Sequence, residues 1–429
     1  MNDIEVSYTW LDFGSNDAPE IDATFADFKL AIDGQVITRI LDKRAQTTRD
    51  IIRTPLFPLA EWLVTNWWSV FYEERTPGKP QAAADTESRH CLYGAQEGFA
   101  LPRLNIYSEG DNVNLSWMVS HSEYQHVEFI STGDVSVPRP AFHKAAVKII
   151  EAVLDRLDSL GIPSPALLEN WNAIQNSDHE ETEFCTAAAL LGMDPYEIPD
   201  DTGQLMIELW SQIPVGLRAD AFSASTIEKL PEVGRWIREG LEKIRPAPES
   251  QTRVQRRAGL YPKPKLGNIA TPWEYGYTLA RHARKKLKLP EGVAVNLDDF
   301  TDQNSSPARS TPLPTIDGLA GFRRQLITCY TNKRRPESLR FMVARSMLSL
   351  LYGSNSNVIL LTSAITARQQ SERAFAAELL IPSTTIKARI SSEAITQDEI
   401  ADIAADFSVS SFVVEYQIRN HHLAKISDV

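Results

Sequence analysis

Arg345 and Ser349 lie four residues apart in a segment whose apolar residues recur at helical spacing. Residues with this spacing lie one turn apart on the same side of a helix, and two histidines placed so can bind one metal ion. Here the two positions offer a guanidinium, which stays protonated, and a hydroxyl. All eight histidines of the chain lie outside residues 336–382, and no His-x-x-x-His pair occurs. We therefore expect no two-histidine zinc site, no metal and no other cofactor.

A second segment, residues 371–382, reads S-E-R-A-F-A-A-E-L-L-I-P. It resembles the E-A-N-x-F-A-A-E-L-L-M-P helix of the ImmA/IrrE-type metallopeptidases. Residues 340–351, R-F-M-V-A-R-S-M-L-S-L-L, are similar to the preceding helix of that family, R-F-T-L-A-H-E-L-G-H-L-L. The resemblance implies a zincin-like domain, mainly helical with a small sheet. Weaker similarities extend it over roughly residues 268–426: an opening helix at 271–290, an acidic segment at 296–300, strands at 318–322 and 326–330, and closing helices at 403–410 and 413–420.

Aligned in this way, all four catalytic positions of the family are changed. The two metal histidines fall on Arg345 and Ser349, the catalytic glutamate on Ser346, and the third ligand on Ser371. Glu372 is one residue out of register, which on a helix turns it about 100° from the ligand position. The resemblance thus implies a scaffold without its metal centre. Its former cleft would be a binding site lined by Arg345, Ser346, Ser349, Glu372 and Arg373.

The whole chain reads as an α+β multidomain protein. Residues 1–163 are expected to form a mixed α and β domain of unknown role, because Asp33-Gly34 is a strong hairpin turn and helical and alternating patterns follow it. Its expected elements are a hairpin over 28–41, a helix over 58–72, strands over 104–107, 113–118 and 125–131, and a helix over 142–160. A helical segment at 164–245, a basic proline-containing linker at 246–267 and the zincin-like domain at 268–429 complete the predicted organisation.

Composition adds a charge asymmetry. Residues 1–250 hold 20 Lys and Arg against 40 Asp and Glu, and residues 251–429 hold 24 against 16, so the balances of −20 and +8 sum to the net charge of −12. The halves could attract each other or face different partners, or these could be ordinary solvated faces. No apolar run could span a membrane, no signal peptide is evident, and the three cysteines show no disulfide or metal spacing, so we expect a cytoplasmic protein.

The favoured functional hypothesis is a degenerate metallopeptidase-like protein that acts by binding. The former cleft would hold a protein segment without cutting it, or would dock another part of this chain. Because members of the family often cleave helix-turn-helix repressors, the resemblance implies a bacterial regulatory setting, such as stress response, mobile-element control or phage defence. The expected partner is a repressor-like protein or a subunit of a complex.

Two alternatives remain open. One is an active hydrolase with a non-standard site, built from histidines of the first domain that could meet in space: His90, His121, His126 and His143. The other is a nucleic-acid-binding subunit that uses the basic half. Its phosphate-binding residues would be Arg281, Arg284, Lys285, Lys286, Lys288, Lys333, Arg334 and Arg335. A helix-turn-helix-like unit at 397–420 is better explained as a structural end cap, because its second helix offers few basic or amide side chains.

Overall fold

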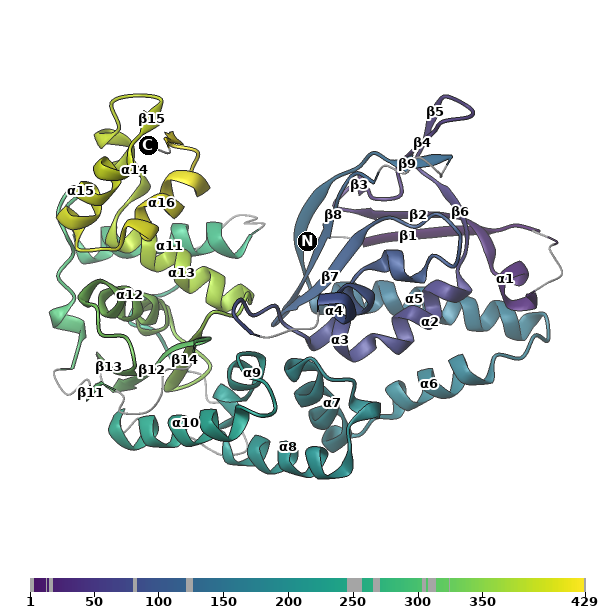
Figure 1. Ribbon diagram of the computed structural model, residues 1–429, viewed down its shortest axis with the longest axis horizontal. Coiled ribbons are helices and arrows are strands. Elements are labelled where there is room, and N and C mark those ends of the chain that lie inside the picture. The colour runs from purple at the N-terminus through teal and green to yellow at the C-terminus, as the bar shows by residue number, and fades with distance from the viewer. Residues whose placement is uncertain are drawn as a thin grey trace. The chain divides into compact units, whose positions relative to one another are not determined.

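The computed structural model describes residues 4–12, 14, 18–79, 83–120, 126–244, 257–264, 271–302, 306–307, 314–323 and 325–427 (Figure 1). Contacts between Cα atoms divide the chain into two compact units. The first contains residues 1–75 and 80–199, and the second contains residues 76–79 and 200–429. The chain is a mixed α+β protein with several small, mainly antiparallel sheets, a strand-rich N-terminal region and a helical middle.

The first unit is built from short sheets and the helices that pack on them. Its strands are β1 (Ile4–Trp10), β2 (Phe25–Ile32), β3 (Gln35–Val36), β4 (Ile40–Asp42), β5 (Thr47–Arg49), β6 (Ile52–Pro55), β7 (Leu104–Glu109), β8 (Asn112–Trp117), β9 (Val127–Phe129) and β10 (Gly133–Pro138). Its helices are α1 (Pro19–Ala23), α2 (Phe57–Thr65), α3 (Trp67–Tyr72), α4 (Ala83–His90), η1 (Leu92–Ala95), α5 (Arg139–Ser159), α6 (Pro165–Asn176), α7 (His179–Leu191) and η2 (Pro195–Glu197).

Several strands in this unit pair with their neighbours along the chain, whereas β4 pairs with the distant β9 as well as with β5. β2 pairs with β1, β3 and β6, and β8 lies between β7 and β10. The hairpin predicted at Asp33-Gly34 is confirmed: both residues have positive φ, 48° and 78°, as a tight turn between strands requires. α2, α3 and α5 bury their apolar faces in one core with these sheets. The predicted helix over 58–72 is interrupted at Asn66, which caps α2 and begins α3.

The second unit places helices around one four-stranded sheet. Its strands are β11 (Ser306–Pro307), β12 (Ile316–Arg323), β13 (Leu326–Thr331), β14 (Val358–Thr362), β15 (Ala394–Ile395) and β16 (Lys425–Ile426). Its helices are α8 (Asp200–Gln212), α9 (Val215–Ser223), α10 (Leu230–Ile244), α11 (Pro272–Leu287), η3 (Asp298–Phe300), α12 (Pro336–Tyr352), α13 (Ala367–Leu380), α14 (Ser383–Arg389), α15 (Gln397–Phe407) and α16 (Ser411–Asn420).

In this sheet the order is β11-β13-β12-β14, with β12 antiparallel to both neighbours. α12 packs against β12 and β13, α13 packs on α11 and α12, and α10 and α9 pack on the strands as well (Figure 1). The helices and strands expected between residues 271 and 420 are present, including the small sheet and the closing pair α15 and α16. The segment 164–245 is helical as expected, but the contact division falls inside it, between Pro199 and Asp200.

Of the linker predicted at 246–267, only residues 257–264 belong to the described part of the chain. There Arg257 forms a bridge to Ser354, and its guanidinium donates to Ser349 O at 3.1 Å. None of the described helices combines the length and the apolarity needed to cross a lipid bilayer.

Candidate functional site

The positions singled out by the sequence lie on two helices that pack together. α12 begins at Pro336, a residue suited to a first helical turn, and Gly353 ends it with a positive φ of 88°. α13 is capped by Thr366, whose hydroxyl accepts from Gln369 N at 3.1 Å. Ten of the 17 residues of α12 and ten of the 14 residues of α13 are buried, so polar side chains on their facing sides must find partners inside the protein.

Arg345 is at the centre of this interior. Its side chain is 2% exposed, and its guanidinium pairs with Asp317 on β12, with 2.6 Å between Nη1 and Oδ2. The other terminal nitrogen donates to Gln369 Oε1 and, at 3.2 Å, to Thr362 O. Lys333 Nζ lies 2.9 Å from the second Asp317 oxygen. The guanidinium of Arg345 thus joins α12 to β12, β14 and α13.

Glu372 continues the network on α13. Its Oε2 lies 3.7 Å from Arg345 Nη2, and its Oε1 accepts from Arg368 at 2.6 Å. Arg368 also contacts both carboxylate oxygens of Asp220, each at 2.6 Å. Asp220 belongs to α9, and its Oδ1 accepts a second hydrogen bond from Gln369 Nε2 at 3.1 Å. The network therefore joins α12, α13 and the sheet to a helix nearly 150 residues earlier in the chain.

The electrostatics of the network follow from burial and from charge balance. Burial opposes ionisation of Asp317, but the charges of Arg345 and Lys333 hold its pKa below the usual range. Burial raises the pKa of Glu372, and the nearby charges of Arg368 and Arg345 only partly offset it. Burial, with Arg345 nearby, lowers the pKa of Arg373 to about 10. Its guanidinium donates to Ala364 O at 2.9 Å.

The three serines of the aligned catalytic positions are all buried. Ser346 Oγ donates to Met342 O, one turn back on α12, at 3.0 Å. Ser371 Oγ lies 2.8 Å from Pro272 O and 2.7 Å from Ala367 O, so it faces α11 and its own helix. The acidic side chain beside Arg345 is Glu372. Glu372 therefore faces Arg345 on α12, whereas Ser371, one residue earlier on the same helix, faces α11.

The residues proposed to line the former cleft thus lie mostly in the interior of the second unit. Arg345, Ser346, Ser349, Ser371 and Glu372 are each buried, and Arg373 is partly exposed. Two side chains essential to the arrangement, Asp220 and Asp317, were not recognised from the sequence. The only local signal for Asp317 is its place on a strand before an apolar run, and Asp220 offers none.

The predicted basic patch is only partly at the surface. Arg284 is buried and donates to Pro290 O at 2.7 Å and to Leu379 O, so it is a structural residue of α11. Arg281 pairs with the buried Glu378, with 2.8 Å between Nε and Oε1. The remaining members of the set are exposed: Lys285, Lys286, Lys288, Lys333, Arg334 and Arg335.

The histidines of the first unit have separate surroundings. His90 is fully buried, with Nδ1 2.7 Å from Ile106 O and Nε2 3.1 Å from Glu73. His126 contacts Arg44, and His143 packs against the ring of Trp67. His121 lies outside the described residues. Within the described part of the chain, no group of three or more His, Cys, Asp or Glu side chains could hold a metal ion.

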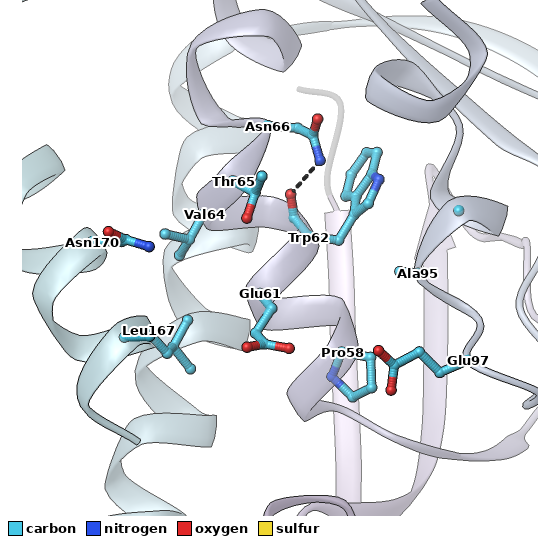
Figure 2. A pocket seen from close by; sticks show the side chains of 12 residues that line it. Pro58, Glu61, Trp62, Val64, Thr65, Asn66, Ala95, Glu97, Leu167 and Asn170 are labelled. Carbon is cyan, nitrogen blue, oxygen red and sulfur yellow. Dashed lines mark hydrogen bonds between the residues drawn. The ribbon is translucent and has the colours of Figure 1, made fainter. Parts of the chain in front are cut away.

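The first unit also contains a cavity that sequence reasoning did not find. It has a volume of about 300 Å³ and lies between α2 and α6, with Glu61 and Glu97 among its lining residues (Figure 2). No sequence pattern marks it, because its walls come from three separate stretches of the chain.

No protein-family model matches this chain, and no curated protein is detectably similar to it.

The ion pair between Asp317 and Arg345 predicts that the protein loses stability at low pH. Because the folded-state pKa of Asp317 is lowered, the stability it contributes is present above its unfolded pKa of about 3.9 and is lost as the pH falls through the folded value. We expect the free energy of unfolding to drop more between pH 5 and pH 3 in the wild type than in Asp317→Asn, measured by urea denaturation. Asp402→Asn, at an exposed position of α15, should keep the wild-type slope. Equal slopes in wild type and Asp317→Asn would contradict the assignment.

Proposed function

We propose that this protein is a catalytically degenerate, metallopeptidase-like protein that acts by binding, as a regulatory or complex-forming subunit. Its setting would be stress response, mobile-element control or phage defence, and its partner another protein. The observation that carries the proposal is Arg345, a buried guanidinium paired with Asp317 at the position where the resemblance implies a metal ligand.

The chemistry of the network supports a non-catalytic role. A guanidinium has five donors and no acceptor, so it repels a metal ion rather than binding one. Ser346, at the position of the catalytic base, has a hydroxyl that is used within its own helix. The described interior therefore offers neither a water-activating metal set nor a free general base at these positions.

The burial of these residues favours the second use considered for the former cleft, the docking of another part of this chain. Asp220 brings α9 onto Arg368 and Gln369, and Ser363 Oγ donates to Pro77 O at 2.7 Å. We infer from these contacts that other parts of this chain fill the former cleft. A partner would then bind an outer surface. Phe412 and Tyr416, one turn apart on α16 and 71% and 62% exposed, are aromatic residues of the kind enriched in protein interfaces.

The hydrolase and nucleic-acid alternatives have less support. The described histidines of the first unit do not share partners, and three members of the basic patch, Arg281, Arg284 and Lys333, are used within the protein. Nucleic-acid binding by the remaining exposed residues would fall steeply with salt, which a titration at two ionic strengths would reveal.

Metal content tests the proposal directly. We expect purified, untagged protein, after dialysis, to contain less than about a tenth of an equivalent of zinc by elemental mass spectrometry, because a four-coordinate site needs imidazole, thiolate or carboxylate ligands. Zinc near one equivalent, together with proteolysis that a chelator abolishes, would overturn it.

A variant designed to bind zinc tests separately whether α12 and α13 are arranged as in a metallopeptidase. Arg345→His with Ser349→His would place two imidazoles one turn apart beside the native Glu372, the ligand set of a two-histidine, one-carboxylate zinc site. We expect about one equivalent of zinc in the double variant and far less in the matched Arg345→His single variant. A folded double variant without zinc, by circular dichroism and elemental analysis, would argue against a peptidase-like arrangement of α12 and α13.

A further inference from the structure

The cavity of the first unit has a distinct chemical character. Its walls come from α2 and the start of α3, from η1 and Glu97 just after it, and from α6 (Figure 2). At about 300 Å³ it is at the lower end of the size range of small-molecule sites, so it suits a compact ligand. The ring of Trp62 forms part of one wall, and its Nε1 donates to Ser88 O at 3.0 Å, so the indole offers the cavity its carbon surface.

Two carboxylates, Glu61 and Glu97, line the cavity without a compensating charge. None of the described lining residues is Lys, Arg or His, and neither glutamate forms an ion pair with a described residue. Burial raises the pKa of Glu61, and the charges of Glu97 and Glu20 raise it further. The site therefore holds negative charge that a bound cation would stabilise.

The other polar groups of the cavity are suited to accept hydrogen bonds. Asn66 Nδ2 donates to Trp62 O at 2.9 Å, which leaves its Oδ1 as an acceptor. Asn170 adds a further amide from α6. Glu97 has a φ of +40°, an uncommon conformation for a residue other than glycine, and the next residue, Gly98, has a φ of +87°. Figure 2 shows Glu61 and Glu97 entering from different stretches of the chain, near Pro58.

We propose that this cavity binds a small organic cation through an alkylammonium or guanidinium group. Such a group supplies several N–H donors and a positive charge, which match two carboxylates and amide oxygens, while its carbon chain lies on Trp62. The cation could be a free diamine or the side chain of a lysine or arginine in a protein segment. Two carboxylates are too few for a dedicated metal cage, in keeping with the lack of a metal-holding group among the described residues. This inference does not depend on the proposed function.

Isothermal titration calorimetry of the full chain would test the site with putrescine, Nα-acetyl-arginine methylamide and Nα-acetyl-lysine methylamide, at constant ionic strength. Butane-1,4-diol, which has the length of putrescine but no charge, is the matched control ligand. We expect at least one cation to bind and the diol not to bind. Preference for putrescine would identify a free diamine as the ligand, and preference for the lysine or arginine analogue would identify a protein side chain.

Matched variants distinguish this cavity from general charge attraction. Glu61→Gln and Glu97→Gln should each weaken cation binding by about tenfold or more. Glu169→Gln, an exposed residue of α6 next to Asn170 and outside the lining, should leave it unchanged. Glu97 is exposed, so its variant should keep the circular dichroism spectrum and melting temperature of the wild type. Absence of binding by every cation, or binding that survives both lining substitutions, would overturn the proposal.

Discussion

Replacing Arg345 by methionine is expected to destabilise the second unit by about 3–5 kcal/mol. Methionine fills similar volume, but it removes the charge that faces the fully buried Glu372 and the partly buried Asp317. Asp317 would keep only Lys333, and Glu372 would keep only Arg368. Breaking a buried ion pair from one side costs far more than the pair itself contributes, because a charge is left without its partner.

Urea denaturation, together with hydrogen–deuterium exchange of residues 336–352, would measure this loss in the second unit itself. Arg335→Met is the matched control, because Arg335 is exposed at the start of α12 and should change stability by no more than about 0.5 kcal/mol. If Arg345→Met and Arg335→Met behaved alike, the buried network would not be the organising feature of the site.

Gly276→Ala is expected to have the next largest effect. A Cβ atom at this position of α11 would lie 2.3 Å from Ser371 O and 3.0 Å from Phe375 N, which are backbone atoms of α13. Backbone of a packed helix cannot move aside as a flexible side chain can, so α11 and α13 would have to separate. We expect a loss of about 1–3 kcal/mol or more in the free energy of unfolding, measured by urea denaturation.

Gly234→Ala, in the same unit, is expected to change the free energy of unfolding in the opposite direction. Gly234 is also helical, in α10, and the nearest atom to its added Cβ would be Leu209 Cδ2 at 3.7 Å, an ordinary contact. Alanine is favoured over glycine inside a helix, so this variant should gain about 0.5–1 kcal/mol. A gain in both variants would mean that the close approach of α11 to α13 is not as described.

The elements around the site could be predicted because their signals are local. The apolar spacing of residues 340–351 predicts a helix, and α12 is present from Pro336 to Tyr352. The two closing helices are likewise present as α15 and α16, although α15 ends at Phe407 and a turn at Ser408, with a positive φ of 51°, replaces the last residues of the helix expected at 403–410. Turns and periodic faces depend on residues a few positions apart, so the sequence contains enough information to place them.

The interior of the site could not be predicted for a different reason. Ser371 faces Pro272 of α11, almost a hundred residues earlier, while Glu372 faces Arg345 of α12, and no local pattern in the sequence distinguishes these two orientations. The role of Asp220 depends on a contact across 148 residues. A motif alignment assigns side chains to a site by their sequence position alone. It carries no information on how the helices pack against one another, and this packing decides which side chain faces the site.

The short segment 76–79 has a practical consequence for expressing parts of this protein. It belongs to the second unit although residues on both sides of it belong to the first, so that unit is assembled from two separate stretches of chain. A truncation starting at Asp200 would remove the carbonyl of Pro77 that accepts from Ser363, and Gly78 would no longer pack near Thr315. No single cut releases the second unit whole. Isolated fragments should therefore carry residues 76–79 through a designed linker or circular permutation.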